Sequence, residues 1–256
     1  MSRYGAMFAK NEGVFGAFVM LGDPDLAMSA AILDELVAGG ADMLEVGIPF
    51  SDPIADGPVI QAAAERALRA GVTPDDCFTL LAAFRARHPD VPVGILTYAN
   101  LVLGRGRDAF YRRAAEAGVD SVLVADVPFF EAAPYAAAAR AHRIDPVLIA
   151  AANTPPERLA DIASLGGGYT SCVARAGVTG TNAQVRFDHA HMLAALRRAD
   201  APPPVFGFGI SKPDHVRAAL QAGASGVISG SAIVERIAAG RPLADFLRTM
   251  KAATRA

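Results

Sequence analysis

Three carboxylates lie close together in residues 44–58, which read LEVGIPFSDPIADGP. Glu45 interrupts an otherwise apolar run, and Asp52 and Asp56 follow in a proline-broken loop. Burial raises the pKa of a carboxyl group towards the range in which it can both donate and accept a proton near neutral pH. The segment therefore offers general acid–base chemistry if the fold brings these side chains into one cleft.

Each acid also has a structural interpretation. Asp52 precedes a proline, as residues of Asx-turns do, so we expect it to shape the loop. Asp56 precedes Gly57 and Pro58, and a role at the start of a helix is open for it. Glu45 could instead form a buried ion pair, but an acid inside an apolar strand is the stronger candidate for acid–base work.

Glycines gather in three later segments, 176–180, 207–211 and 229–231. Glycine permits close approach to the backbone, and N–H groups at the start of a helix bind anions. These segments therefore predict a phosphate site. The alternative is that Ser211 and Ser231 only cap helices, Ser211 in a capping box with Asp214.

The remaining polar residues indicate no metal site and no nucleic-acid partner. The formal net charge is −2, without a basic stripe. Cys77 and Cys172 are far apart and outside any CxxC pattern, as expected of buried thiols in a reducing compartment. We expect the histidines to be solvated surface residues; they are His88, His142, His189, His191 and His215.

The elements that must position these residues alternate along the whole chain. Eight short apolar runs have the uniform hydrophobicity of buried parallel strands; they are 15–21, 43–46, 93–96, 121–124, 146–149, 169–173, 205–207 and 226–228. Helical segments lie between them, among them 27–38, 59–70, 109–117, 131–141, 156–165, 189–198, 213–222, 232–238 and 243–252. Glycines after several helices suit a left-handed terminating residue.

Eight βα units in 256 residues predict an α/β fold, a single (β/α)8 TIM barrel that occupies 1–256 as one domain. An extra N-terminal helix and a short phosphate-binding helix after strand eight belong to this expectation. An open doubly wound sheet is the alternative, but no GxGxxG follows the first run. No apolar stretch is long enough for a signal peptide or membrane span, so we expect a cytoplasmic protein. The acidic and glycine-rich segments all follow predicted strands, on the rim where barrel enzymes carry their chemistry.

The motifs GIPFSDPIADGP (47–58) and RAGVTG (175–180), with TYAN (97–100), GFGIS (207–211) and ISGSAI (228–233), resemble the tryptophan synthase alpha chain. The resemblance extends in order over nearly the whole chain. It implies cleavage of indole-3-glycerol phosphate to indole and glyceraldehyde 3-phosphate, a carbon–carbon lyase reaction. It also implies a beta-chain partner in an alpha-beta-beta-alpha complex, which receives the indole. The alpha chain has no cofactor, and pyridoxal phosphate is expected only in the beta chain.

The resemblance assigns roles to individual residues. It implies that Glu45 is the acid–base carboxylate and Asp56 the second catalytic one. Loop closure over the substrate is implied for Arg175 and Thr179, with Thr179 meeting Asp56. The implied phosphate ligands are Gly180, Gly209, Gly230 and Ser231. The implied indole pocket consists of Phe18, Leu96, Tyr98, Leu123, Ile149 and Phe208.

Two positions depart from the family pattern. Ser171 stands where many members carry a tyrosine near the catalytic glutamate, and Ala174 replaces a serine before the loop arginine. We therefore expect a roomier or wetter pocket in which Glu45 is less firmly oriented. Two other functions stay open: a free-standing indole-3-glycerol phosphate lyase, and a non-catalytic subunit that binds the phosphate ligand to regulate a partner.

Overall fold

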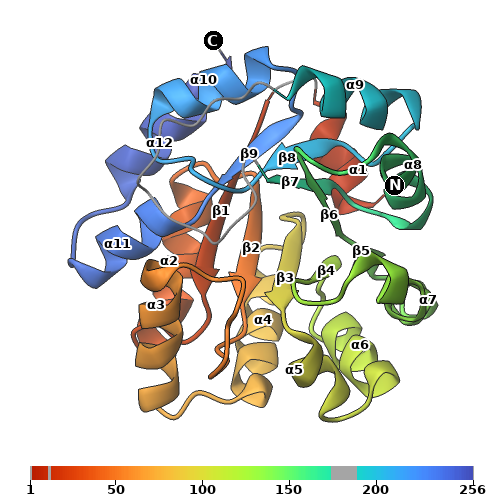
Figure 1. Cartoon of the computed structure of the whole chain (residues 1–256). Coiled ribbons are helices and arrows are strands. Elements are labelled where there is room, and N and C mark those ends of the chain that lie inside the picture. Colours follow the sequence, from red (N-terminus) through yellow and green to blue (C-terminus); the bar gives the residue numbers. More distant parts are fainter. Residues whose placement is uncertain (1, 11–12, 174–188, 256) are drawn as a thin grey trace.

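The computed structural model describes residues 2–10, 13–173 and 189–255 of the chain. Parallel strands form the centre of the molecule, and helices surround them (Figure 1). Within the described residues, none of the helices combines the length and hydrophobicity that a membrane span requires.

The strands form one sheet with the order β5-β4-β3-β2-β1-β9-β8-β7-β6, and every pair is parallel. They are β1 (Val14–Met20), β2 (Met43–Gly47), β3 (Val93–Thr97), β4 (Ser121–Val124), β5 (Asp145–Pro146), β6 (Leu148–Ala151), β7 (Thr170–Val173), β8 (Pro204–Phe206) and β9 (Gly226–Ser229). The outermost strands β5 and β6 are joined by Val147, whose N–H donates to the carbonyl of Val122 at 3.0 Å. One continuous segment thus closes the sheet, and the predicted barrel is confirmed.

Helices follow the strands. They are α1 (Arg3–Phe8), α2 (Leu26–Ala38), α3 (Pro58–Arg69), α4 (Pro74–Arg87), α5 (Ala99–Leu103), α6 (Arg107–Glu116), α7 (Ala132–Ala141), α8 (Pro156–Leu165), α9 (Ala190–Arg198), α10 (Pro213–Gln221), α11 (Ser231–Ala238) and α12 (Ala244–Ala252), with short 3-10 turns η1 (Phe129–Glu131) and η2 (Ala253–Arg255). The extra N-terminal helix is α1, and the short helix after the last strand is α11.

The sequence pattern predicted most of these elements and missed some. The predicted run 146–149 is divided between β5 and β6, because its first part pairs with β4 and its second with β7. Helix α4 was not among the expected helices, although Thr73 and Asp76 form a capping box at its start. The glycines expected to terminate helices do adopt positive φ, at 102° in Gly40, 75° in Gly118 and 102° in Gly223.

The barrel has two apolar layers. One packs the outward faces of the strands against the helices and includes Phe15, Leu44 and Phe206. The other fills the barrel interior and includes Phe18, Met43, Leu123, Tyr169 and Ile228. Since side chains alternate along a strand, Glu45 points into the interior while its neighbours Leu44 and Val46 point outward.

An ionic cluster closes the barrel at the end where the strands begin. Asp120 precedes β4 and accepts from Arg3 at 2.8 Å, from Arg85 at 2.7 Å and from the N–H of Val93 at 2.8 Å. The next residue of α1, Tyr4, reaches into the interior. Its hydroxyl lies 2.8 Å from that of Ser121, and its ring centroid lies 5.6 Å from that of Tyr169.

Candidate active site

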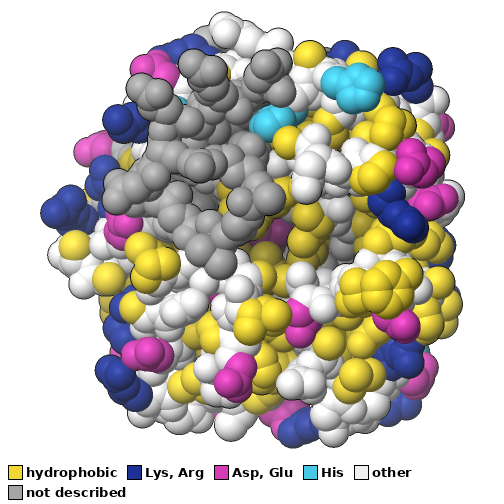
Figure 2. All heavy atoms as spheres, in the orientation of Figure 1, with side chains coloured by type: hydrophobic (Ala, Val, Ile, Leu, Met, Phe, Trp, Pro, Cys, Tyr) yellow, Lys and Arg dark blue, Asp and Glu magenta, His cyan; other side chains and the backbone are white. Residues whose placement is uncertain are grey.

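A cavity opens at the other end of the barrel, where the strands finish. Its empty space is about 780 Å³, including open solvent at the mouth. Hydrophobic side chains gather around a hollow at the centre of this face (Figure 2). The cavity is lined by Phe18, Glu45, Ala55, Asp56, Ile60, Leu96, Leu123, Ala125, Ile149, Ser171, Gly207, Phe208, Gly209, Ile210, Ser211, Gly230, Ser231 and Ala232.

Glu45 reaches the cavity from the middle of β2 and is only 6% exposed. Burial raises its pKa from 4.5 to about 7; the hydrogen bond from Tyr169 opposes this rise, and the nearby Asp56 adds to it. The Tyr169 hydroxyl donates to Oε1 of Glu45 at 2.5 Å. Burial keeps the pKa of Tyr169 well above its usual value of 10, so this hydroxyl stays protonated. Glu45 can thus exchange a proton near neutral pH while a fixed donor orients it.

The expectation that Ser171 leaves Glu45 less firmly oriented stays a prediction, but Glu45 does have one fixed partner. Ser171 does line the cavity, and no aromatic ring stands at that position. Tyr169, two residues earlier and so on the same face of the strand, supplies the hydroxyl instead. The sequence contained a signal for Tyr169, because residues two positions apart on a strand point to the same face.

Asp56 lies in the loop between β2 and α3 and is 4% exposed. Burial raises its pKa from 3.8 to about 6, and the neighbouring Tyr98 hydroxyl opposes the rise. The backbone of Asp56 is held on both sides: its N–H donates to the carbonyl of Pro53 at 3.0 Å, and its carbonyl accepts from Gln61 Nε2 at 2.7 Å. Its carboxyl group is thereby aimed into the cavity and does not cap α3, whose N-cap is Gly57.

The third acid of the segment does not reach the cavity. Asp52 is exposed, and it accepts a hydrogen bond of 2.5 Å from the hydroxyl of Ser51. Its carbonyl accepts from the N–H of Ile54 at 3.0 Å. The predicted role in loop shape agrees with these contacts.

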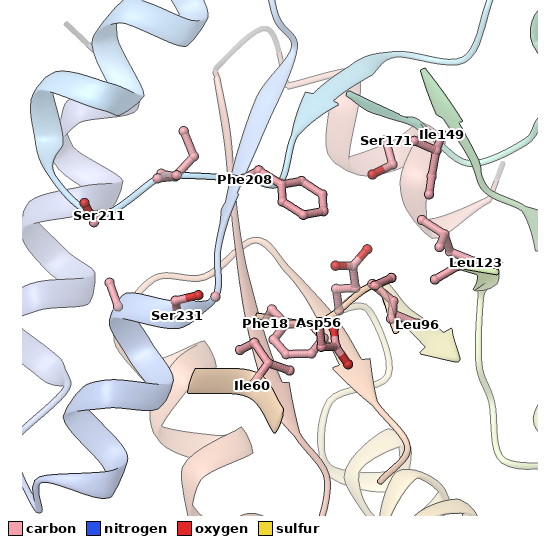
Figure 3. A pocket seen from close by; sticks show the side chains of 18 residues that line it. Phe18, Asp56, Ile60, Leu96, Leu123, Ile149, Ser171, Phe208, Ser211 and Ser231 are labelled. Atoms are coloured by element: carbon pink, nitrogen blue, oxygen red, sulfur yellow. The ribbon is translucent and has the colours of Figure 1, made fainter. Parts of the chain in front are cut away.

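Gly209, Gly230 and Ser231 line the side of the cavity formed by the loops after β8 and β9. Ser211 and Ser231 lie on one side of the cavity, and Ser171, Ile149 and Leu123 lie on the other (Figure 3). The alternative that both serines only cap helices is wrong. The N-cap of α10 is Lys212 and that of α11 is Gly230, and neither cap makes a side-chain hydrogen bond.

Five of the six residues expected to hold an indole ring line the cavity: Phe18, Leu96, Leu123, Ile149 and Phe208. The sixth, Tyr98, does not. It lies behind the wall with 2% exposure, and its ring stacks on Phe50 with centroids 5.4 Å apart. Its buried hydroxyl makes no hydrogen bond of good geometry within the described residues, although it is near enough to Asp56 to influence that acid.

Comparisons with known proteins match the whole barrel. The family model described as "Tryptophan synthase alpha chain" matches residues 5–255. The tryptophan synthase alpha chain of Serratia proteamaculans is 53% identical, with 100% of both chains covered. That of Shewanella amazonensis is 52% identical, over 99% of this chain and 100% of the relative.

The chain belongs to the tryptophan synthase alpha chain family.

Solved structures agree with this assignment. The structure of Mycobacterium tuberculosis tryptophan synthase superposes with a TM-score of 0.90 at 33% identity, over 100% of this chain and 99% of that one. A structure from Aquifex aeolicus VF5 superposes with a TM-score of 0.92 at 30% identity and full coverage of both chains. Tryptophan synthase alpha chains are lyases of tryptophan biosynthesis that cleave indole-3-glycerol phosphate, and this chain has that function.

Several residues expected from the tryptophan synthase alpha chain pattern lie outside the described residues: Ala174, Arg175, Thr179 and Gly180. Their roles stay predictions. One histidine departs from its predicted surface position: His189 is 7% exposed, and its ring centroid lies 5.4 Å from that of Phe206. Within the described part of the chain, no three His, Cys, Asp or Glu side chains form a group suited to a metal ion.

Proposed function

We propose that Glu45 and Asp56 are the two catalytic carboxylates of indole-3-glycerol phosphate cleavage. The observation that carries this assignment is their shared position in one cavity, where both carboxyl groups are buried and both have raised pKa values. Buried acids whose pKa lies near the working pH are suited to proton transfer. In this proposal the whole chain, residues 1–256, forms one catalytic domain.

The reaction is a retro-aldol cleavage, for which the indole ring must first become an electron sink. Glu45 in its acid form gives a proton to C3 of the indole, which produces an indolenine cation. Glu45, now a carboxylate, then takes the proton of the adjacent side-chain hydroxyl. The carbon–carbon bond breaks, its electron pair restores the aromatic ring, and the hydroxyl carbon becomes the aldehyde of glyceraldehyde 3-phosphate. General acid–base catalysis contributes roughly 10²–10⁴-fold to such steps.

Asp56 stabilises the cation. In its ionised form it accepts a hydrogen bond from the ring N–H, where positive charge develops as C3 is protonated. The bond from Gln61 to its backbone and the near-complete burial of its side chain support this role, because a fixed charge needs no reorganisation during the reaction.

The substrate phosphate, in this proposal, binds N–H groups of Gly209, Gly230 and Ser231. Gly230 is the N-cap of α11 and Ser231 its first residue, so the free N–H groups and the positive end of the helix dipole face the cavity. Binding at this end sets the distance of the reacting carbons from Glu45. Gly180, Arg175 and Thr179 complete the proposed site.

Replacing Glu45 by Gln tests the assignment. The variant keeps the size of the side chain and an acceptor for Tyr169 but cannot transfer protons. Indole release should fall by about 10³-fold or more, while the affinity for a non-cleavable phosphate analogue stays within about threefold. Asp52→Asn is the matched control, since Asp52 lies in the same segment but is exposed. Turnover of Glu45→Gln close to that of the unmodified chain would remove Glu45 from the mechanism.

The partner in this proposal is a beta chain, in an alpha-beta-beta-alpha complex that works in the cytoplasm. Pyridoxal phosphate belongs to the beta chain, and this chain uses no cofactor. The rim supports a docking surface: the large apolar side chains of Ile54, Leu103 and Phe130 are 73%, 47% and 77% exposed. They follow β2, β3 and β4, which are neighbours in the sheet, and we propose that the three side chains form one surface on the rim. Contiguous exposed apolar surface marks interaction sites, and the proposal assigns these three side chains to such a surface.

The proposed docking surface is tested by measuring how much the rate of indole release increases when a beta chain is added. Phe130→Asp should weaken the complex by about tenfold or more, because a charge would be buried against apolar groups. Leu68→Asp is the control, since Leu68 is an exposed leucine of α3 that lies away from these loops. Equal activation of both variants would place the interface elsewhere. Full activity without any beta chain would instead favour a free-standing lyase.

A further inference from the structure

The cavity wall opposite the phosphate-binding side contains an unusual pair. Ser171 and Ile149 are cross-strand partners on β7 and β6, and both line the cavity. Ile149 is 36% exposed, which is high for a large apolar side chain inside a barrel mouth. Ser171 is 5% exposed, and its hydroxyl makes no hydrogen bond to any described residue. The wall therefore offers uncovered apolar surface beside a hydroxyl group that no other described residue binds (Figure 3).

The proposed substrate pose, on which this inference rests, directs one part of the indole to this wall. The phosphate lies at Gly209, Gly230 and Ser231, and the reacting carbons lie at Glu45 and Asp56. The benzo edge of the ring then points away from the phosphate, towards Leu123, Ile149 and Ser171. An unsubstituted edge is pure hydrocarbon. It would cover Ile149 favourably but would remove water from the Ser171 hydroxyl without replacing that hydrogen bond, which costs free energy.

We infer that Ser171 is a specificity-determining residue, which lets the chain accept indole rings that carry a small polar substituent, such as a hydroxyl, on the benzo edge. The side chain of serine is short, so a substituent fits in front of it. Its hydroxyl can donate to or accept from the substituent, and the adjacent Ile149 still packs on the ring face. A site that hydrogen-bonds a substrate group discriminates strongly against the analogue that lacks it.

The test uses the reverse reaction, the condensation of glyceraldehyde 3-phosphate with indoles. Values of kcat/KM are measured for indole and for indoles with a hydroxyl or a methyl group at each of the four benzo positions. We expect at least one hydroxyindole to react as well as indole and better than the methylindole substituted at the same position. Rejection of every substituted indole by tenfold or more would overturn the inference.

Variants of Ser171 distinguish the effect of the space in front of this side chain from the effect of the hydrogen bond that its hydroxyl makes to the substituent. Ser171→Ala keeps the space, so the ratio of hydroxyindole to methylindole should fall about fivefold at the accepted position. Ser171→Leu fills the space, so both substituted indoles should lose about tenfold relative to indole. Thr170→Ser is the control on the same strand: Thr170 faces out of the barrel, where its hydroxyl donates to the carbonyl of Pro202 at 2.9 Å. It should change neither ratio.

Two failures are distinguishable. Unchanged ratios in Ser171→Ala would refute the role of Ser171 while leaving the proposed cleavage intact. Absence of condensation with unsubstituted indole would refute the proposed function itself, and the inference with it.

Discussion

The hydroxyl of Tyr169 donates a 2.5 Å hydrogen bond to Oε1 of Glu45, and both side chains are buried inside the barrel. Two opposing effects meet at this contact. Burial disfavours the carboxylate and raises the pKa of Glu45 to about 7, whereas the phenolic hydroxyl stabilises the carboxylate. Without Tyr169 the acid would titrate at a still higher pH. The tyrosine thus keeps Glu45 poised between its two protonation states near neutrality.

Tyr169→Phe should shift the pH dependence of catalysis. Protonation of C3 needs the acid form of Glu45, so kcat/KM falls as the pH rises through about 7. Removing the hydroxyl raises the pKa of Glu45 and moves this basic limb to higher pH. Tyr4→Phe is the control, because Tyr4 contacts the ring of Tyr169 but its hydroxyl pairs with Ser121. A basic limb that stays in place in Tyr169→Phe would show that the hydroxyl does not influence Glu45.

Asp56→Asn should shift the basic limb of the pH profile in the direction opposite to Tyr169→Phe. The charge of Asp56 raises the pKa of Glu45, so its removal shifts the basic limb to lower pH. The acidic limb near pH 6, which reflects loss of the Asp56 charge, should disappear. We expect kcat to fall by roughly 10²–10³-fold, as for loss of one electrostatic stabiliser. An acidic limb that persists in the variant would belong to another group.

Glu45→Gln should make the protein more stable at alkaline pH. The folded-state pKa of Glu45 is raised, so the folded protein binds this proton more tightly than the unfolded chain. Its contribution to stability is present below about pH 4.5 and is lost as the pH rises through about 7. The variant should therefore gain on the order of 3 kcal/mol in unfolding free energy at pH 8 and little at pH 4.5. Denaturant titrations at both pH values measure this, and an equal gain at both would exclude charge burial as the cause.

Arg66→Ala should destabilise the fold. Arg66 on α3 donates two hydrogen bonds, of 2.7 and 2.8 Å, to Asp23, a carboxylate that is 2% exposed in the loop after β1. Its removal leaves a buried charge without its partner, at a cost of about 3 kcal/mol. The control is Arg69→Ala on the same helix, where the pair with Glu65 is exposed and contributes well under about 1 kcal/mol. Equal unfolding free energies for the two variants would contradict this account.

The sequence predicted the barrel because strand and helix periodicities are local. It also indicated Glu45, since an acid in an apolar strand is unusual wherever the strand lies. The partner of Glu45 was missed, because Tyr169 is 124 positions away and only the closed barrel brings the two together. Tyr98 was expected in the indole pocket but lies outside the cavity lining. The position of a residue beyond a strand end depends on the side chains around it, and the Tyr98 ring stacks on Phe50. The bond from Gln61 to Asp56 depends on loop geometry that spacing does not specify.

Helix α1 connects the ionic cluster at the start of the strands with the side chains inside the barrel. Arg3 bonds Asp120 outside the strand starts, and the adjacent Tyr4 contacts the ring whose hydroxyl holds Glu45. Loss of the Tyr4 ring, as in Tyr4→Ala, is therefore expected to reach the acid–base group through a single intervening side chain, whereas Tyr4→Phe keeps the ring and its contact with Tyr169. A preparation that lacks the Tyr4 ring should not serve as the reference in kinetic comparisons.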